Sequence, residues 1–221
     1  MYHYIDDTEF LHEIRALSGE IMQDLCHTLK EDHQIGANFY LVGSGARNLI
    51  TQNASNPVDL DYNLEIVKCE DFYDCQHLKE CVTKAFNKSL LAHDLSACED
   101  SKSVLTTKRI YIRNGNRTGF SIDVCITFRD ETDNYYRLIH EKTGFVYFDR
   151  YFWNKAPHSA KLKRKADAIK KAGKWELVRQ QYLNLKNQYL SRNVLDHPSF
   201  VCYIEAVNNV YNSIKHWGWF S

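Results

Sequence analysis

Residues 58–66 read VDLDYNLEI, a strict alternation of apolar and polar side chains. This period of two is typical of a β-strand, in which successive side chains point to opposite faces. Asp59 and Asp61 then share one face, and Leu60, Tyr62 and Leu64 share the other. Two carboxylates so placed repel each other unless a cation lies between them. A hard divalent ion such as Mg²⁺ takes carboxylate oxygens, so this strand predicts a cation-binding edge.

A second segment, residues 120–126, reads FSIDVCI and repeats the pattern. Asp123 lies on its polar face, opposite Ile122 and Val124. It is a third isolated carboxylate inside an apolar strand. If this strand lies beside the first, we expect the three carboxylates to converge.

A third segment precedes both strands. Residues 38–42, NFYLV, predict a short buried strand that ends at Gly43-Ser44-Gly45, and a helix is expected to begin in residues 46–50. Backbone N–H groups at such a strand-to-helix turn, together with the helix dipole, suit phosphate oxygens. Glycine lets the backbone approach a ligand closely. Gly43 and Ser44 are therefore candidate phosphate-binding residues.

Each segment alone has an ordinary interpretation: a solvated strand face, a turn, an exposed acid. Their order resembles the DNA polymerase beta-like nucleotidyltransferase superfamily, whose signature is an apolar run ending in Gly-Ser, an hDxDh strand and a later hDh carboxylate. The matching segments are LVGS at 41–44, VDLDY at 58–62 and IDV at 122–124, and the resemblance covers residues 38–128. Residues 45–48, GARN, depart from the continuation seen in several branches, which leaves the substrate class open.

The resemblance implies an α+β fold with a nucleotidyltransferase-like mixed β-sheet and flanking helices, followed by a C-terminal helical lobe. It also implies transfer of a nucleoside monophosphate from a nucleoside triphosphate to an acceptor hydroxyl, on a small molecule, a protein or RNA. Asp59, Asp61 and Asp123 would act as catalytic and metal-binding residues for Mg²⁺ or Mn²⁺. Gly43 and Ser44 would bind the outgoing phosphates, and Arg47 would add positive charge. Two alternatives stay open: an inactive nucleotide-binding or protein-interaction module of the same fold, and an unrelated α/β protein.

Apolar periodicity predicts the remaining elements. We expect helices over 8–30 and 70–92, and strands over 108–113 and 119–128 joined by a hairpin turn at 114–116. Helices are expected over 159–191 and 199–216. The chain then divides into a nucleotidyltransferase-like domain, residues 1–150, and a helical C-terminal lobe, residues 151–221.

Charge is unevenly distributed although the net charge is zero. Residues 1–154 carry 24 acidic and 16 basic side chains, whereas residues 155–192 carry 2 acidic and 11 basic ones. The basic block is compatible with nucleic-acid binding, but a solvated helix face is the favoured interpretation. An intermediate interpretation has Lys161, with Lys163 or Arg164, binding the triphosphate.

Composition limits the remaining classes of function. A hydrophobic fraction of 44% suffices for a packed core. No apolar run is long enough for a bilayer, and residues 1–10 do not resemble a secretory signal, so no membrane partner is expected. The seven cysteines, an odd number without CxxC spacing, indicate reduced thiols of a cytoplasmic protein. His140, His158 and His197 are expected to be ordinary surface or capping residues, and the aromatic run 147–153 is expected to pack rather than stack on a base.

Overall fold

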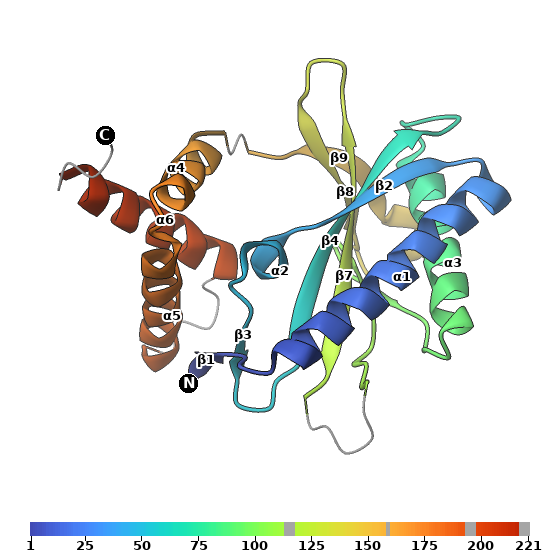
Figure 1. The fold of residues 1–221 in the computed structure, drawn as a ribbon. Coiled ribbons are helices and arrows are strands. Elements are labelled where there is room, and N and C mark those ends of the chain that lie inside the picture. The colour runs from blue at the N-terminus through green and yellow to red at the C-terminus, as the bar shows by residue number, and fades with distance from the viewer. Residues whose placement is uncertain (113–117, 158–159, 193–197, 217–221) are drawn as a thin grey trace. The chain divides into compact units, whose positions relative to one another are not determined.

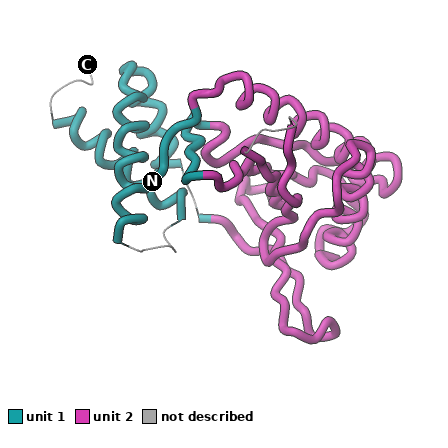
Figure 2. Tube along the Cα trace, turned by 90° about the horizontal axis from the view of Figure 1, so that it is seen from below, with its two compact units in different colours: residues 1–5, 47–54, 157–221 teal, residues 6–46, 55–156 magenta. Residues whose placement is uncertain are grey.

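The computed structural model describes residues 1–112, 118–157, 160–192 and 198–216. The chain forms two compact units (Figures 1 and 2). The sheet unit comprises Asp6–Ala46 and Ser55–Ala156. The helical unit comprises Met1–Ile5, Arg47–Ala54 and Pro157–Ser221.

The sheet unit contains a seven-stranded mixed sheet, as the resemblance implied. Its main path runs β2-β4-β7-β6-β5, and β8 and β9 extend it from β7. β4 and β7 are parallel, and the other pairs are antiparallel. The strands are β2 (Gly36–Leu41), β4 (Val58–Lys68), β5 (Glu99–Asp100), β6 (Leu105–Thr106), β7 (Phe120–Arg129), β8 (Tyr135–Glu141) and β9 (Arg150–Lys155).

Two long helices, α1 (Thr8–His33) and α3 (Cys75–Ala92), pack against each other beside this sheet (Figure 1). Asp7 caps α1 by accepting a hydrogen bond from the Phe10 amide, which satisfies one of the donors that a helix start leaves unpaired. The apolar face of β4 is buried as the alternation predicts, and the Tyr62 hydroxyl pairs with Ser18 of α1 at 2.7 Å inside the core. This packing leaves the polar face of β4, with Asp59 and Asp61, for the site.

The helical unit is built from α4 (Ala160–Lys171), α5 (Trp175–Ser191) and α6 (Ser199–His216), with a two-stranded sheet of β1 (Tyr2–Tyr4) and β3 (Thr51–Asn53). Its core joins α4, α5 and α6 to Leu49, whose side chain is only 1% exposed. Tyr4 donates a hydrogen bond to the Arg179 carbonyl, and Tyr2 donates its amide to Asn187. The amino-terminal residues are therefore bound within this unit.

The single helix expected over 159–191 is two helices, so that prediction was wrong in detail. The amides of Gly173 and Lys174 donate to the carbonyls of Lys170 and Ile169, which is the hydrogen-bond pattern of a Schellman helix end. Gly173 has φ +67°, the left-handed conformation that this motif requires. The glycine therefore ends α4, and α5 begins at Trp175.

The strand expected over 108–113 was also wrong. Within the described residues only Ile110 of this segment forms a β-bridge, with Phe120, and the hairpin turn at 114–116 lies outside them. Short strands that the periodicity missed, among them β5 and β6, complete the sheet. No helix in the described ranges has the length and apolar character needed to span a bilayer.

The division of the chain differs from the expected boundary after residue 150. β9 pairs with β8 along its whole length, so the sheet unit continues to Ala156. Two earlier segments, Met1–Ile5 and Arg47–Ala54, belong to the helical unit because β1 pairs with β3 and Leu49 joins its core.

Candidate active site

The strands that carry the three acids lie side by side, which is the arrangement that the convergence of the acids requires. β4 and β7 pair in parallel, so Asp61 is the register partner of Asp123 and Asp59 is the register partner of Ser121. Neighbouring strands are separated by about 4.8 Å, and alternate residues share a face. Asp59, Asp61, Ser121 and Asp123 thus occupy four adjacent positions on the polar face of the sheet.

Gly43 lies directly against this group. The Val42 amide donates to the Asp61 carbonyl at 2.8 Å, which brings the end of β2 beside β4. Gly43 has φ +60°, and a Cβ atom there would lie 2.0 Å from Oδ2 of Asp61. The next residue, Ser44, belongs to the short helix α2 (Gly43–Arg47), whose Gly45 carbonyl accepts a hydrogen bond from Arg15 of α1. The Gly-Ser turn therefore begins directly beside Asp61.

Two hydroxyl groups contact the carboxylates. Ser121 donates to Oδ1 of Asp59 at 2.6 Å, and Thr106 donates to Oδ1 of Asp123 at 2.6 Å. Burial is the main cause that raises the pKa of Asp123 above its ordinary value, and the nearby Asp59 charge adds to it. The Thr106 hydrogen bond opposes both. Asp123 is thus a partly buried acid whose charge is costly in the absence of a cation.

The donor atoms suit a hard divalent ion. Over the described ranges, no three His, Cys, Asp or Glu side chains form a ready-made ion-binding cluster. The acids nevertheless offer carboxylate oxygens at neighbouring register positions, and Gly43, which has no side chain, lies against Asp61 without displacing its carboxylate. Mg²⁺ is usually held by one or two carboxylates together with substrate phosphates, so this set fits such an ion once a nucleotide is bound.

Arg47 and Lys161 belong to the helical unit, whereas Gly43, Ser44 and the three acids belong to the sheet unit. The Arg47 guanidinium lies 4.4 Å from the centre of the Tyr203 ring. The backbone carbonyl of Arg47 accepts a hydrogen bond from the Trp175 indole. Lys161 is exposed on α4. A nucleotide-binding role for either residue stays a prediction.

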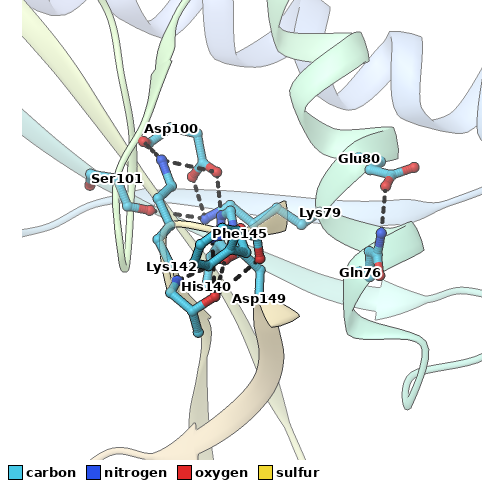
Figure 3. A network of polar contacts seen from close by, with 10 residues as sticks. Gln76, Lys79, Glu80, Asp100, Ser101, His140, Lys142, Phe145 and Asp149 are labelled. Carbon is cyan, nitrogen blue, oxygen red and sulfur yellow. Dashed lines mark hydrogen bonds and ion pairs between the residues drawn. The ribbon is translucent and has the colours of Figure 1, made fainter. Parts of the chain in front are cut away.

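The structure corrects the expectation for His140. This residue is 5% exposed, and its side chain lies between two carboxylates, with Nδ1 2.5 Å from Asp100 and Nε2 3.1 Å from Asp149 (Figure 3). Asp100 also pairs with the buried Lys79 at 2.6 Å, and the His140 ring stacks on Tyr151. The sequence held one signal for a buried histidine: His140 directly follows the apolar Leu138 and Ile139 in the segment YYRLIHE of β8. His158 and His197 lie outside the described residues.

The aromatic run 147–153 has two parts. Trp153 donates its indole N–H to the Phe72 carbonyl at 2.6 Å and packs on Phe128. Tyr147 and Phe148, in contrast, are 99% and 70% exposed. The packing interpretation therefore describes the β9 part of the run and not the preceding turn.

Comparisons with known proteins support the fold. No protein-family model matches the sequence, and no curated protein matches it significantly. Among solved structures, Escherichia coli CdnC with ATP aligns with 94% of this chain and 61% of its own, at 13% identity and a TM-score of 0.59.

Two further structures are similar. Elizabethkingia meningoseptica CdnE cyclic dinucleotide synthase, with GTP and Apcpp, aligns with 88% of this chain and 69% of its own, at 14% identity and a TM-score of 0.52. Vibrio cholerae DncV cyclic AMP-GMP synthase, with a linear intermediate, aligns with 79% and 47%, at 16% identity and a TM-score of 0.54. The chain therefore spans about three fifths of CdnC and about half of DncV. These similarities show the fold of the chain, which is that of CdnC, CdnE and DncV.

Proposed function

We propose that this chain is a metal-dependent nucleotidyltransferase that transfers a nucleoside monophosphate from a nucleoside triphosphate to an acceptor hydroxyl. The observation that carries the proposal is the register pair Asp61–Asp123 with Gly43 packed against Asp61. In an unrelated sheet with scattered acids, nothing would require a glycine in the left-handed conformation at that one position.

The residues would divide the work as follows. Asp59, Asp61 and Asp123 would hold Mg²⁺ or Mn²⁺, which when bound neutralises charge on the triphosphate oxygens. The Gly43 backbone and Ser44 would hold the outgoing phosphates, with Arg47 and Lys161 as proposed additional cationic contacts. Asp123 would also receive the proton of the acceptor hydroxyl, since a carboxylate with a raised pKa is a better proton acceptor.

We propose a second nucleotide as the acceptor. CdnE and DncV are named as a cyclic dinucleotide synthase and a cyclic AMP-GMP synthase, and the proposal extends that acceptor class to this chain. All seven cysteines are free thiols, which agrees with a reducing compartment such as the cytoplasm.

The test is a panel of the four ribonucleoside triphosphates, singly and in pairs, with Mg²⁺ or Mn²⁺. Pyrophosphate release and chromatography of labelled products are measured. We expect release with at least one combination, and background levels for Asp61→Asn and Asp123→Asn. Glu65→Gln is the matched control, because Glu65 lies on the same strand and points to the same face as Asp61 but pairs with Arg129.

The alternative is an inactive nucleotide-binding module of the same fold. It predicts that calorimetry detects nucleotide binding while no combination releases pyrophosphate. Failure of both binding and release, in a protein that is folded by circular dichroism, would remove the nucleotide proposal altogether.

A further inference from the structure

The strand register itself brings the two hydroxyl groups to the carboxylates. Ser121 is the parallel register partner of Asp59, and Thr106 is the antiparallel register partner of Asp123. Side chains at directly opposed positions have Cβ atoms about 5 Å apart, so each hydroxyl reaches its carboxylate across one strand boundary. The contacts therefore follow from the backbone arrangement and not from one long, freely rotating side chain.

Both hydrogen bonds are short, and in each of them the hydroxyl donates to the Oδ1 atom of its own aspartate. A hydroxyl that donates to an ionised carboxylate at 2.5–2.7 Å makes a charge-assisted bond, about twice as strong as a neutral one. The terminal torsion of an aspartate is otherwise broad. Each bond therefore fixes the orientation of one carboxylate and directs Oδ2, the oxygen that the hydroxyl does not engage, to other ligands.

Two neighbouring hydroxyls, on Thr107 directly after β6 and on Thr127 within β7, are used differently. Thr107 accepts a hydrogen bond from the backbone amide of Ile122, and Thr127 donates to the Leu64 carbonyl. Those two threonines satisfy buried backbone groups, which is a role in stability. Thr106 and Ser121 contact carboxylates instead, at two of the three acids proposed to bind the metal.

We propose that Ser121 and Thr106 are positioning residues, which orient Asp59 and Asp123 for the divalent ion. This inference rests on the proposed function, because it assigns those acids to the ion. Residues that orient metal ligands typically contribute about 10–100-fold to metal affinity. Ser121 and Thr106 touch neither substrate nor ion in this scheme and act only through the two carboxylates.

The test compares Thr106→Val, Thr106→Ser and Ser121→Ala with Thr107→Val as the matched control. Mn²⁺ affinity is measured by calorimetry with a non-hydrolysable ATP analogue, and thermal unfolding is measured in parallel. We expect Thr106→Val and Ser121→Ala to lose about 10–100-fold in Mn²⁺ affinity while remaining folded. Thr106→Ser keeps the hydroxyl and should bind Mn²⁺ nearly as wild type does. Thr107→Val should unfold at a lower temperature, because the buried Ile122 amide loses its partner, with unchanged Mn²⁺ affinity.

The outcomes separate this inference from the proposed function. Wild-type protein that binds Mn²⁺, together with Thr106→Val and Ser121→Ala variants that bind it equally well, overturns the positioning role and leaves the proposed function intact. A Thr106→Ser variant as weak as Thr106→Val also overturns it, since the hydroxyl would not be the cause. Wild-type protein that binds no Mn²⁺ even with nucleotide removes the metal from the proposed function, and the positioning role with it.

Discussion

Gly43 and Asp61 are in such close contact that a single methyl group would not fit between them. The nearest carboxylate oxygen, Oδ2 of Asp61, lies 2.0 Å from the position that a Cβ at residue 43 would take. The positive φ of Gly43 brings the backbone to this point. The identity of residue 43 and the placement of an acid are therefore coupled.

Gly43→Ala should abolish nucleotidyl transfer and lower the free energy of unfolding. An L-residue in the left-handed region costs about 1–2 kcal/mol, and Asp61 must also move away. Gly173→Ala is the control, because Gly173 has φ +67° but nothing within 4 Å of its would-be Cβ. It should be destabilised by backbone strain alone and keep its activity. Equal activity in both variants would contradict the coupling of Gly43 to Asp61.

Asp123→Asn should raise the melting temperature of the metal-free protein at pH 7 while abolishing activity. Burial, reinforced by Asp59, raises the pKa of Asp123, so the ionised form is disfavoured in the folded state. A group with a raised folded-state pKa stabilises the fold below its unfolded pKa and loses that contribution as pH rises. The amide that replaces the carboxylate in Asp123→Asn is neutral at every pH, so the variant avoids the loss of stability that the ionised carboxylate causes at pH 7. Calorimetry at neutral and acidic pH checks it; a variant that melts lower than wild type at pH 7 would contradict it.

The buried cation Lys79 should be important for stability. Its side chain is 4% exposed and pairs with Asp100, so Lys79→Met leaves that carboxylate without its main cation. Breaking a fully buried pair costs about 3–5 kcal/mol; we expect less here, because Asp100 keeps His140 and Lys142. Lys88→Met, which breaks the exposed pair with Asp32, should have little effect. Urea unfolding of both variants measures the difference, and equal midpoints would refute a special role for Lys79.

Asp149 should make the fold sensitive to acid. The pKa of Asp149 lies below its ordinary value of 3.8, mainly because the Thr143 amide donates a hydrogen bond to its carboxylate and, second, because of the hydrogen bond with His140. A lowered folded-state pKa stabilises the protein above the unfolded value, and the contribution is lost as pH falls through the folded one. Asp149→Asn should therefore be less stable than wild type at pH 7, with the gap narrowing below about 3.8. Denaturant unfolding across an acid titration checks this, and a gap that is constant with pH would contradict it.

A variant of the basic face of α4 distinguishes three interpretations of that face: triphosphate binding, a solvated surface and nucleic-acid binding. If a basic side chain of α4 binds the triphosphate, neutralising Lys161, Lys163 and Arg164 together should weaken triphosphate binding without lowering the melting temperature, because all three are exposed and exposed charges add little stability. A solvated face predicts no change in binding. A nucleic-acid surface predicts loss of oligonucleotide affinity with a steep salt dependence. Titrations with a triphosphate and an oligonucleotide decide among them.

Sequence reasoning was most successful where one short segment determines the structure. The alternation in residues 58–66 was enough to predict a strand with Asp59 and Asp61 on its open face, and the pairing of β4 with β7 confirmed its proximity to Asp123. Thr106 escaped notice because β6 has two residues, too few for a period. His140 was misjudged because its partners, Asp100 and Asp149, come from distant parts of the chain.

The helical unit has a topology that bears on how the protein is made. Its three segments mean that the chain passes between the two units four times. On a ribosome, Tyr2 and Tyr4 emerge long before Asn187 and Arg179, the residues to which they hydrogen-bond. β1 and β3 can pair early, but the helices that complete their unit are made only after Ser55–Ala156 of the sheet unit. Cutting the chain after residue 150 would therefore leave β1 and β3 on a fragment without those helices. The helices, in turn, would lack Leu49 from their core.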